Sequence, residues 1–209
     1  TWETTTTLNI LLETAFLNDR LGLNVAYFDK TTTDMLLPAV KHYTSGVVAL
    51  PDANTGEMNN RGVELELSYR DFKPSSDWGY NVGLNLTFLE NKLVKLYGEG
   101  KYIDNEVART YEGQPIGSFY GWKTAGIYQN QGQIDNDPNI SEDPRRPDIT
   151  PGDVIFVDTN EDNLVDEQDR VKIGDGSPTT LLGLYFDVSF KGLTLSGVFS
   201  GAYGHELYD

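Results

Sequence analysis

The sequence contains no cysteine, so it can form neither disulfide bonds nor thiolate metal sites. None of its apolar runs approaches the roughly 18 residues of a membrane-spanning helix. Basic residues are scarce, with 16 Lys and Arg against 32 Asp and Glu, which gives a net charge of −16. Nucleic acid is therefore a poor partner, because phosphate binding requires a face rich in Lys and Arg. These features exclude helical membrane proteins, small disulfide-bonded folds and nucleic-acid-binding proteins.

Residues typical of strands and turns are abundant instead, including 21 Gly and 11% aromatic residues. Apolar residues alternate with small or polar ones, which is the period of a β-strand with one apolar face. Six tracts share this alternation: 8–16, 21–27, 63–70, 78–88, 182–191 and 193–200. The sequence therefore predicts an all-β, antiparallel protein.

The tracts are long for a soluble β-protein. The longest of them span about 9–11 residues, whereas strands of soluble proteins average about five or six, and tilted strands that cross a bilayer need about 9–11. The face opposite the apolar one is small and polar, and it carries Glu64, Glu66, Asp187 and Lys191. This combination is typical of a transmembrane β-barrel, in which lipid contacts one face and a wet lumen contacts the other.

The connections between the tracts are alternately short and long. Asn18-Asp19, residues 73–76 and Lys191-Gly192 are short, whereas the segments that begin at residues 37 and 89 are long. Outer-membrane barrels have short periplasmic turns and long extracellular loops. Six strands cannot close such a barrel, and an open edge in lipid would leave backbone groups unpaired. The chain is therefore expected to be a fragment of a larger barrel.

This interpretation divides the chain into three parts. Residues 1–91 are expected to form barrel strands with one extracellular loop at 37–60, residues 92–179 a large acidic extracellular subdomain, and residues 180–209 a strand hairpin. A strand-like tract at 119–129 would break the alternation of short and long connections if it crossed the membrane alone. We therefore place this tract inside the extracellular subdomain, together with a strand at 153–158.

Residues 99–170 contain 16 acidic and 6 basic residues, and within them residues 158–169 follow the spacing of the twelve-residue calcium loop. Asn163 stands at the position that is usually Gly, and the final position has Asp instead of the longer Glu. We predict a structural calcium site; the alternative is a surface turn that binds no metal. The predicted oxygen donors are Asp158, Asn160, Asp162, the Leu164 carbonyl, Asp166 and Asp169.

Two soluble alternatives remain open at this point. A secreted β-sandwich that binds carbohydrate, with calcium as a staple, would bury the apolar faces in its core. A glycan hydrolase would use Glu64 and Glu66 as its carboxylate pair, although acids that face a lumen explain them more simply. We favour a protein that is not an enzyme.

Four aromatic residues of the subdomain could stack on sugars or pack its core, and we favour packing: Tyr111, Tyr120, Trp122 and Tyr128.

Several motifs, in order along nearly the whole chain, resemble the C-terminal barrel portion of SusC/RagA-type TonB-dependent transporters from the Bacteroidetes outer membrane. The motif residues are Trp2-Glu3-Thr4-Thr5, Asn18–Leu21, Tyr27–Asp34, Asn59–Glu64, Gly113–Gly121, Gly126-Ile127, Pro151-Gly152-Asp153, the acidic loop, Asp169-Arg170, Ile173-Gly174 and Pro178. The family usually has Gly at the position of Asn163 in this loop. This difference bears on the affinity of the loop for metal and leaves the resemblance to the family unchanged.

The resemblance implies a barrel of about 22 strands with an N-terminal plug and a TonB-contacting segment, both outside these residues. It also implies import of oligosaccharides or peptides across the outer membrane, with a SusD-like surface lipoprotein as a lid. The partners expected from it are that lipoprotein, TonB, a glycan or peptide substrate, and outer-membrane lipid.

Overall fold

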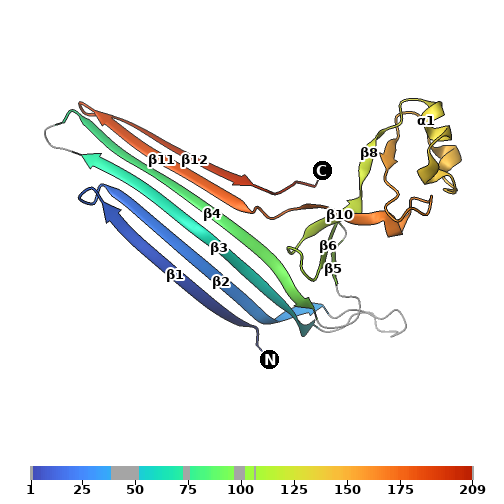
Figure 1. The fold of residues 1–209 in the computed structure, drawn as a ribbon, viewed down its shortest axis with the longest axis horizontal. Coiled ribbons are helices and arrows are strands. Elements are labelled where there is room, and N and C mark those ends of the chain that lie inside the picture. Colours follow the sequence, from blue (N-terminus) through green and yellow to red (C-terminus); the bar gives the residue numbers. More distant parts are fainter. Residues whose placement is uncertain (1, 39–51, 73–75, 97–101, 106, 209) are drawn as a thin grey trace.

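The computed structural model describes residues 2–38, 52–72, 76–96, 102–105 and 107–208, and its largest element is one six-stranded antiparallel sheet (Figure 1). The strand order in this sheet is β1-β2-β3-β4-β11-β12. The strands are β1 (Thr4–Phe16), β2 (Leu21–Pro38), β3 (Asp52–Phe72), β4 (Trp78–Leu96), β11 (Thr180–Phe190) and β12 (Leu193–Tyr203). The prediction of an all-β, antiparallel chain is confirmed.

The register of the strands collects the apolar residues on one face of this sheet. One row across five strands consists of Leu23, Leu67, Leu84, Leu184 and Phe199. Many apolar side chains of this face are exposed, and among the described residues no second sheet pairs with or extends the six strands. An apolar face this wide suits lipid rather than water. The arrangement therefore disfavours the soluble β-sandwich, whose apolar faces would pack against each other.

The opposite face is polar along the same strands. A neighbouring row consists of Glu13, Asn24, Glu66 and Asn85, and the Asn24 side-chain amide donates a hydrogen bond to Glu66 at 3.1 Å. These four residues and Glu64 contribute to a groove of about 400 Å³ on this face. The face is therefore suited to line a water-filled lumen, and Glu64 and Glu66 lie on it as part of the wall.

The β1–β2 and β11–β12 turns lie at the same end of the sheet (Figure 1). The β1–β2 turn contains three consecutive residues with positive φ, Leu17 to Asp19, and the β11–β12 turn uses Lys191 and Gly192 in the same region of φ. Aromatic rings gather beside these turns, where Trp78 stacks on Tyr80 and contacts Phe190. Short turns with an aromatic girdle are typical of the periplasmic end of an outer-membrane barrel, in keeping with the prediction that the long connections are extracellular. The opposite end of the sheet is therefore called the extracellular end below.

The strands continue past the predicted tracts at the extracellular end. Pairing of β2 with β3 reaches Pro38 opposite Asp52, so part of segment 37–60 is strand, and β4 extends to Leu96. Polar cross-strand contacts support this extension: the Asn59 amide donates to Asp29 at 2.6 Å, among others. The predicted tracts ended where the apolar alternation ended, but backbone pairing continues past that point, with register shifts near Met35 and Met58.

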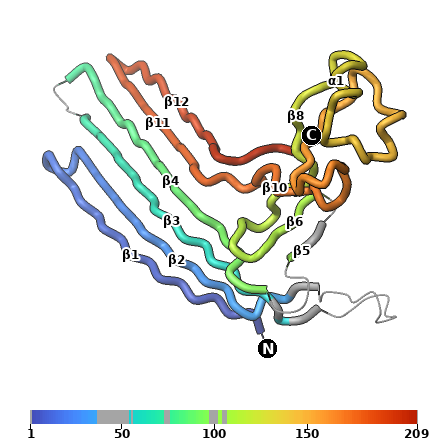
Figure 2. The backbone as a smooth tube through the Cα atoms, turned by 45° about the vertical axis from the view of Figure 1, so that its right-hand side comes forward, coloured from blue at the N-terminus to red at the C-terminus, as the bar shows by residue number. Residues whose placement is uncertain are grey.

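The remaining strands form a separate subdomain at the extracellular end (Figure 2). Four of them form a sheet in the order β10-β7-β6-β5, and β8 pairs with β9. Its elements are β5 (Tyr102–Asn105), β6 (Ala108–Tyr111), β7 (Ser118–Trp122), β8 (Thr124–Ile127), α1 (Gln131–Asp135), β9 (Val154–Phe156) and β10 (Arg170–Asp175). The tract 119–129 thus contributes to β7 and β8, outside the six-stranded sheet, as predicted. Within the described ranges, no helix is long and apolar enough to span a membrane.

Gly62 on β3 lies where two neighbouring strands leave no room for a side chain. A Cβ at this position would collide with the Phe88 carbonyl oxygen and the Phe28 ring, whereas a Cβ at Gly183 would lie 3.6 Å from Asn85, an ordinary contact. We expect Gly62→Ala to destabilise the sheet by about 1–3 kcal/mol through overpacking. The measurement is the folded fraction of the barrel by heat-modified gel mobility, with Gly183→Ala as the matched control. Equal folded fractions for the two variants would contradict this account.

Candidate functional site

The extracellular subdomain has its own small hydrophobic core. Tyr128, Ile134, Ile140 and Val165 are buried together in it. The Tyr128 hydroxyl donates a 2.6 Å hydrogen bond to Asp137, and the Trp122 indole nitrogen donates one of 2.7 Å to the Asp166 carbonyl. The hydroxyl of a buried Tyr and the N–H of a buried Trp need such partners. Trp122 and Tyr128 therefore pack the subdomain, as favoured from the sequence. The partly buried residues around the core are Trp122, Ile149 and Ile155.

Three aromatic rings of the four-stranded sheet lie beside arginines, whereas the Tyr111 ring packs between those of Tyr102 and Tyr120, with ring centres 5.4 and 5.9 Å away. The Arg109 guanidinium lies 4.4 Å from the ring centres of both Tyr102 and Tyr120. Arg170 lies 5.4 Å from the Tyr120 ring and 5.2 Å from the Trp122 ring. Cation–π pairs of this kind stabilise a fold by about 0.5–1 kcal/mol each at exposed sites. An arginine thus occupies at least one face of each of these three rings, and that face is not free to stack on a sugar.

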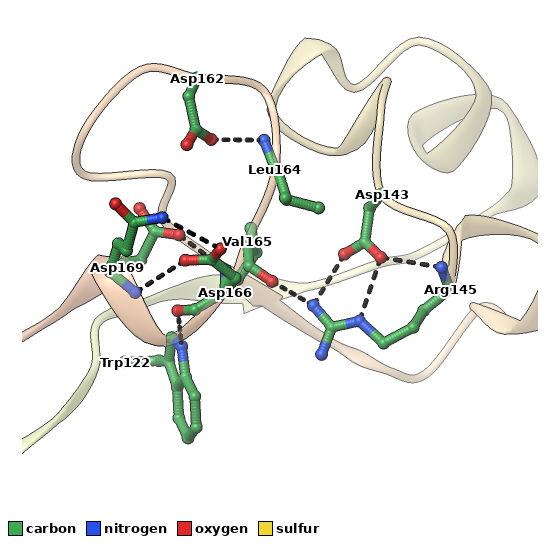
Figure 3. A network of polar contacts seen from close by, with 9 residues as sticks. Trp122, Asp143, Arg145, Asp162, Leu164, Val165, Asp166 and Asp169 are labelled. Atoms are coloured by element: carbon green, nitrogen blue, oxygen red, sulfur yellow. Dashed lines mark hydrogen bonds and ion pairs between the residues drawn. The ribbon is translucent and has the colours of Figure 1, made fainter. Parts of the chain in front are cut away.

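The acidic loop is organised around one buried carboxylate, that of Asp169 (Figure 3). Its Oδ1 accepts hydrogen bonds from the backbone N–H groups of Thr159 at 2.7 Å and Asn160 at 3.4 Å, and its Oδ2 accepts one from Asp166 at 2.8 Å. Burial acts to raise the pKa of Asp169, but these donors outweigh it and the net pKa is lowered. The carboxylate thus joins the two ends of the loop.

Asp158 performs a similar task at the first position of the loop. Its carboxylate accepts hydrogen bonds from the backbone N–H groups of Glu161 and Asn163, at 2.7 Å each, and of Asp162, at 3.3 Å. Asn163 has a φ of 66°, in the left-handed region. Gly is usual at this position because it adopts such a φ without strain, and Asn tolerates it better than most other residues. The Asp162 side chain accepts from the Leu164 backbone at 2.9 Å.

The six predicted calcium donors thus lie in one loop, but their carboxylates are turned toward the loop's own N–H groups. Within the part of the chain that the structure describes, no group of three or more His, Cys, Asp or Glu side chains is placed to hold a metal ion. The donor chemistry suits calcium, whereas the arrangement is not a metal cage. Calcium binding stays a prediction.

The calcium prediction has a direct thermal test. If calcium binds, 100-fold excess over its dissociation constant stabilises the subdomain by about 2.7 kcal/mol. The melting temperature of the subdomain should then be higher in calcium than in EDTA, and Asp158→Ala should remove the difference. Identical melting curves in both buffers would establish a loop that is held by hydrogen bonds alone.

A further buried carboxylate, that of Asp143, was not singled out from the sequence. Arg145 donates to it through its backbone N–H, its Nε and one Nη, at 2.8, 3.0 and 2.8 Å, and also donates to the Val165 carbonyl (Figure 3). This side-chain pairing holds the pKa of Asp143 below its usual value, against the effect of burial. The only sequence signal was the short spacing Asp-Pro-Arg, which is too common to predict a clamp between distant segments.

The lowered pKa of Asp143 predicts an acid-sensitive subdomain. A carboxyl whose pKa is lower in the folded state contributes stability that is complete above its unfolded pKa of about 4 and is lost as the pH falls through the folded value. We expect the subdomain to lose stability below about pH 4, and Asp143→Asn to be less stable at pH 7 with a shallower loss in acid. Protease susceptibility of the loop against pH measures this, with the exposed Asp148→Asn as the control. Parallel pH profiles for Asp143→Asn and the wild type would contradict the assignment.

The architecture now described is that of a known group of proteins. A family model for the TonB dependent receptor-like β-barrel matches residues 1–156. The chain belongs to the TonB-dependent receptor β-barrel family. This receptor barrel is an outer-membrane structure, so the predicted location and the prediction of a barrel fragment are confirmed.

Curated relatives match almost the whole of this chain. The chain is 28% identical over 215 residues to TonB-dependent receptor P3 of Formosa agariphila, covering 99% of this chain and 21% of the relative. It is 25% identical to TonB-dependent receptor SusC of Bacteroides thetaiotaomicron, covering 93% of this chain and 19% of the relative. The chain thus spans about a fifth of the length of the curated relatives that it matches.

A solved structure shows the same fold for this receptor barrel. The structure of the RagAB peptide importer in the closed-closed state superimposes with a TM-score of 0.73 at 24% identity, covering 98% of this chain and 21% of that one. The resemblance to SusC/RagA-type receptors is therefore confirmed by both sequence and fold.

Proposed function

We propose that this chain forms part of a TonB-dependent outer-membrane importer of oligosaccharides or peptides. The observation that carries the proposal is the two-faced sheet of a TonB-dependent receptor barrel. One face presents rows of Leu and Phe toward lipid, and the other presents Glu13, Asn24, Glu66 and Asn85 toward a lumen. A wet, hydrogen-bonding wall suits the passage of polar solutes. The family match also supports transport over the hydrolysis that Glu64 and Glu66 could suggest.

The same proposal includes two protein partners. TonB would supply energy through a part of the transporter beyond these residues, as the family name indicates. A SusD-like surface lipoprotein would act as the lid over the extracellular end, where the acidic subdomain lies. The similarity to SusC and to RagAB supports this partner, because the lid is what SusC/RagA-type receptors are expected to share.

Uptake by intact cells tests the proposed transport. Cells with and without the full-length transporter are given radiolabelled pools of oligosaccharides and, separately, of peptides. We expect one class to accumulate only in cells that have the transporter, and a protonophore to abolish the accumulation. Accumulation of neither class, or accumulation that resists the protonophore, would contradict energised import by this protein.

A further inference from the structure

A groove on the lipid-facing side of the sheet combines apolar and charged residues. Its volume is about 460 Å³, within the usual range for ligand sites. Val63 and Phe88 supply apolar walls, and Arg61 and Glu90 supply charged ones. The other residues that line it are Tyr27, Gly62, Leu89, Thr179 and Thr180. The groove is therefore amphipathic, unlike the apolar surface around Leu84 on the same face.

The length of the apolar band on β4 places this groove at the extracellular boundary of the membrane. The outward side chains of the band, at every second residue, are Trp78, Tyr80, Val82, Leu84, Leu86 and Phe88. Ten residues separate Trp78 from Phe88. Such a length rises about 33 Å along a strand, and at the usual tilt of barrel strands it crosses about 25 Å, the height of a lipid-facing band. Phe88 therefore lies near the edge of the band, and Glu90 lies just beyond it.

The register extends this boundary across the neighbouring strands. One row across the sheet consists of Tyr27, Val63, Phe88, Thr180 and Tyr203. The next row toward the extracellular end consists of Asp29, Arg61 and Glu90. Aromatic side chains such as Tyr27 and Tyr203 are typical of the interface between membrane and water. The charged row therefore lies at the level of the lipid headgroups.

This row presents both signs of charge side by side. The Nε and Nη2 of Arg61 donate to the same oxygen of Glu90, at 2.8 and 2.7 Å, so Nη1 and the second carboxylate oxygen lie outside this pair. The Arg61 side chain is 54% exposed and that of Glu90 52%. The Asp29 carboxylate accepts hydrogen bonds from the Tyr27 hydroxyl and the Asn59 amide, within the wall. Arg61 and Glu90 are thus the two charged side chains that line the groove.

We propose that this groove binds one outer-leaflet lipid whose headgroup carries both a phosphate and an amine. The phosphate accepts hydrogen bonds from Arg61, the amine donates to Glu90, and an acyl chain lies along Val63 and Phe88. A headgroup of a single charge would meet one like charge in the groove, whereas a headgroup with both charges complements both side chains. The strands that form the groove, β2, β3, β4 and β11, are each paired on both sides within this chain. The outer-membrane location supplies lipid as the occupant of this face, whatever solute is imported.

Native mass spectrometry of the full-length transporter in detergent tests the site. The delipidated transporter is titrated with phosphatidylethanolamine, which carries both groups, and with phosphatidylglycerol, which carries the phosphate without the amine. We expect the first phosphatidylethanolamine to bind at least tenfold more tightly than phosphatidylglycerol. Arg61→Gln should weaken binding of both lipids at least tenfold, whereas Glu90→Gln should remove the preference between them. The matched control is Arg20→Gln, which removes an arginine 3.6 Å from Asp71 beside the β1–β2 turn and should change either affinity less than twofold.

Thr180→Trp tests the groove without changing its charges. The larger side chain fills the space beside Phe88, so we expect it to weaken binding of phosphatidylethanolamine at least tenfold. Trp is common at the membrane interface, and an exposed ion pair adds little to stability, so all these variants are expected to fold. Heat-modified gel mobility checks the folding, and Thr180→Trp decides if Arg61→Gln does not fold.

The remaining outcomes identify the occupant. Lipids that co-purify from cells and are lost in Arg61→Gln support the site, and their masses distinguish a phospholipid from a glycolipid with the same two groups. Equal affinities of the wild type for the two test lipids, or unchanged binding by Thr180→Trp, would overturn the proposal. A dimer that Arg61→Gln disrupts, with no lipid bound, would assign the groove to a second copy of the transporter instead. Selective lipid binding without uptake of either solute class would overturn the proposed function alone.

Discussion

Replacing Asp169 by alanine is expected to unfold the acidic subdomain while the six-stranded sheet stays folded. The Asp169 side chain is fully buried and accepts hydrogen bonds from the backbone N–H groups of Thr159, Asn160 and Asp166. Alanine would leave these donors without their acceptor, and each buried unsatisfied group costs about 1–3 kcal/mol. The expected loss is about 3–5 kcal/mol, which is large for a subdomain with a core of a few residues. Limited proteolysis of the loop measures it, and heat-modified gel mobility reports the barrel.

Two variants of the same loop sharpen this prediction. Asp169→Asn keeps one acceptor oxygen for Thr159 and Asn160 but presents an amide to the Asp166 N–H, so its loss should be intermediate. Asp162→Ala removes an exposed carboxylate that accepts hydrogen bonds from the Leu164 N–H and the Asn160 amide. Water can replace both of these exposed bonds, so the variant should cost about 1 kcal/mol or less. If Asp162→Ala were as damaging as Asp169→Ala, and only in the presence of calcium, the loop would be held by metal.

The substitution Leu84→Arg is expected to prevent stable insertion of the barrel into the membrane. The substitution Asn85→Arg, at the next residue, is expected to leave insertion unchanged. Leu84 lies in the apolar row with Leu67 and Leu184, on the face assigned to lipid. Arginine on the lipid face near the bilayer midplane costs about 2–4 kcal/mol. The folded fraction of the transporter in the outer membrane measures the effect.

The control for this prediction is Asn85→Arg, one residue further along β4. Asn85 pairs with Glu66 across the strands and lines the acidic groove of the opposite face. A positive charge there contacts water and carboxylates, so we expect a folded fraction close to that of the wild type. If the two variants behave alike, or in the reverse order, the assignment of the faces is wrong.

Much of the sheet could be predicted from the order of residues along the chain. Alternation identified all six strands, because a strand that separates two environments must place every second side chain in each. The short turns at Asn18-Asp19 and Lys191-Gly192 and the placement of 119–129 outside the membrane followed from the same pattern. The far ends of β2, β3 and β4 did not, since their apolar residues, such as Leu93 and Leu96, no longer alternate strictly and the register shifts near Met35 and Met58.

The site was predicted less completely. The loop 158–169 was found by its spacing, and the left-handed conformation of Asn163 agrees with that spacing. The hydrogen bonds of Asp158 and Asp169 were not predictable, because one set of carboxylates can accept backbone N–H groups or bind a cation. The contact of Arg145 with the Val165 carbonyl joins segments that only folding brings together.

The sequence by itself determined that this chain is β-structured, that its strands are long enough for a bilayer, and that its acidic charge gathers in one extracellular segment. These properties are local, because the apolar period, the length of a strand and the charge of a segment each depend only on neighbouring residues in the chain. Only the tertiary structure decided which carboxylates are buried, which aromatic rings are covered by arginines, and where apolar side chains remain exposed together. Those properties depend on contacts between distant residues, so the exposed apolar side chains of Ile127 and Val154 came to lie together only once β8 and β9 were paired.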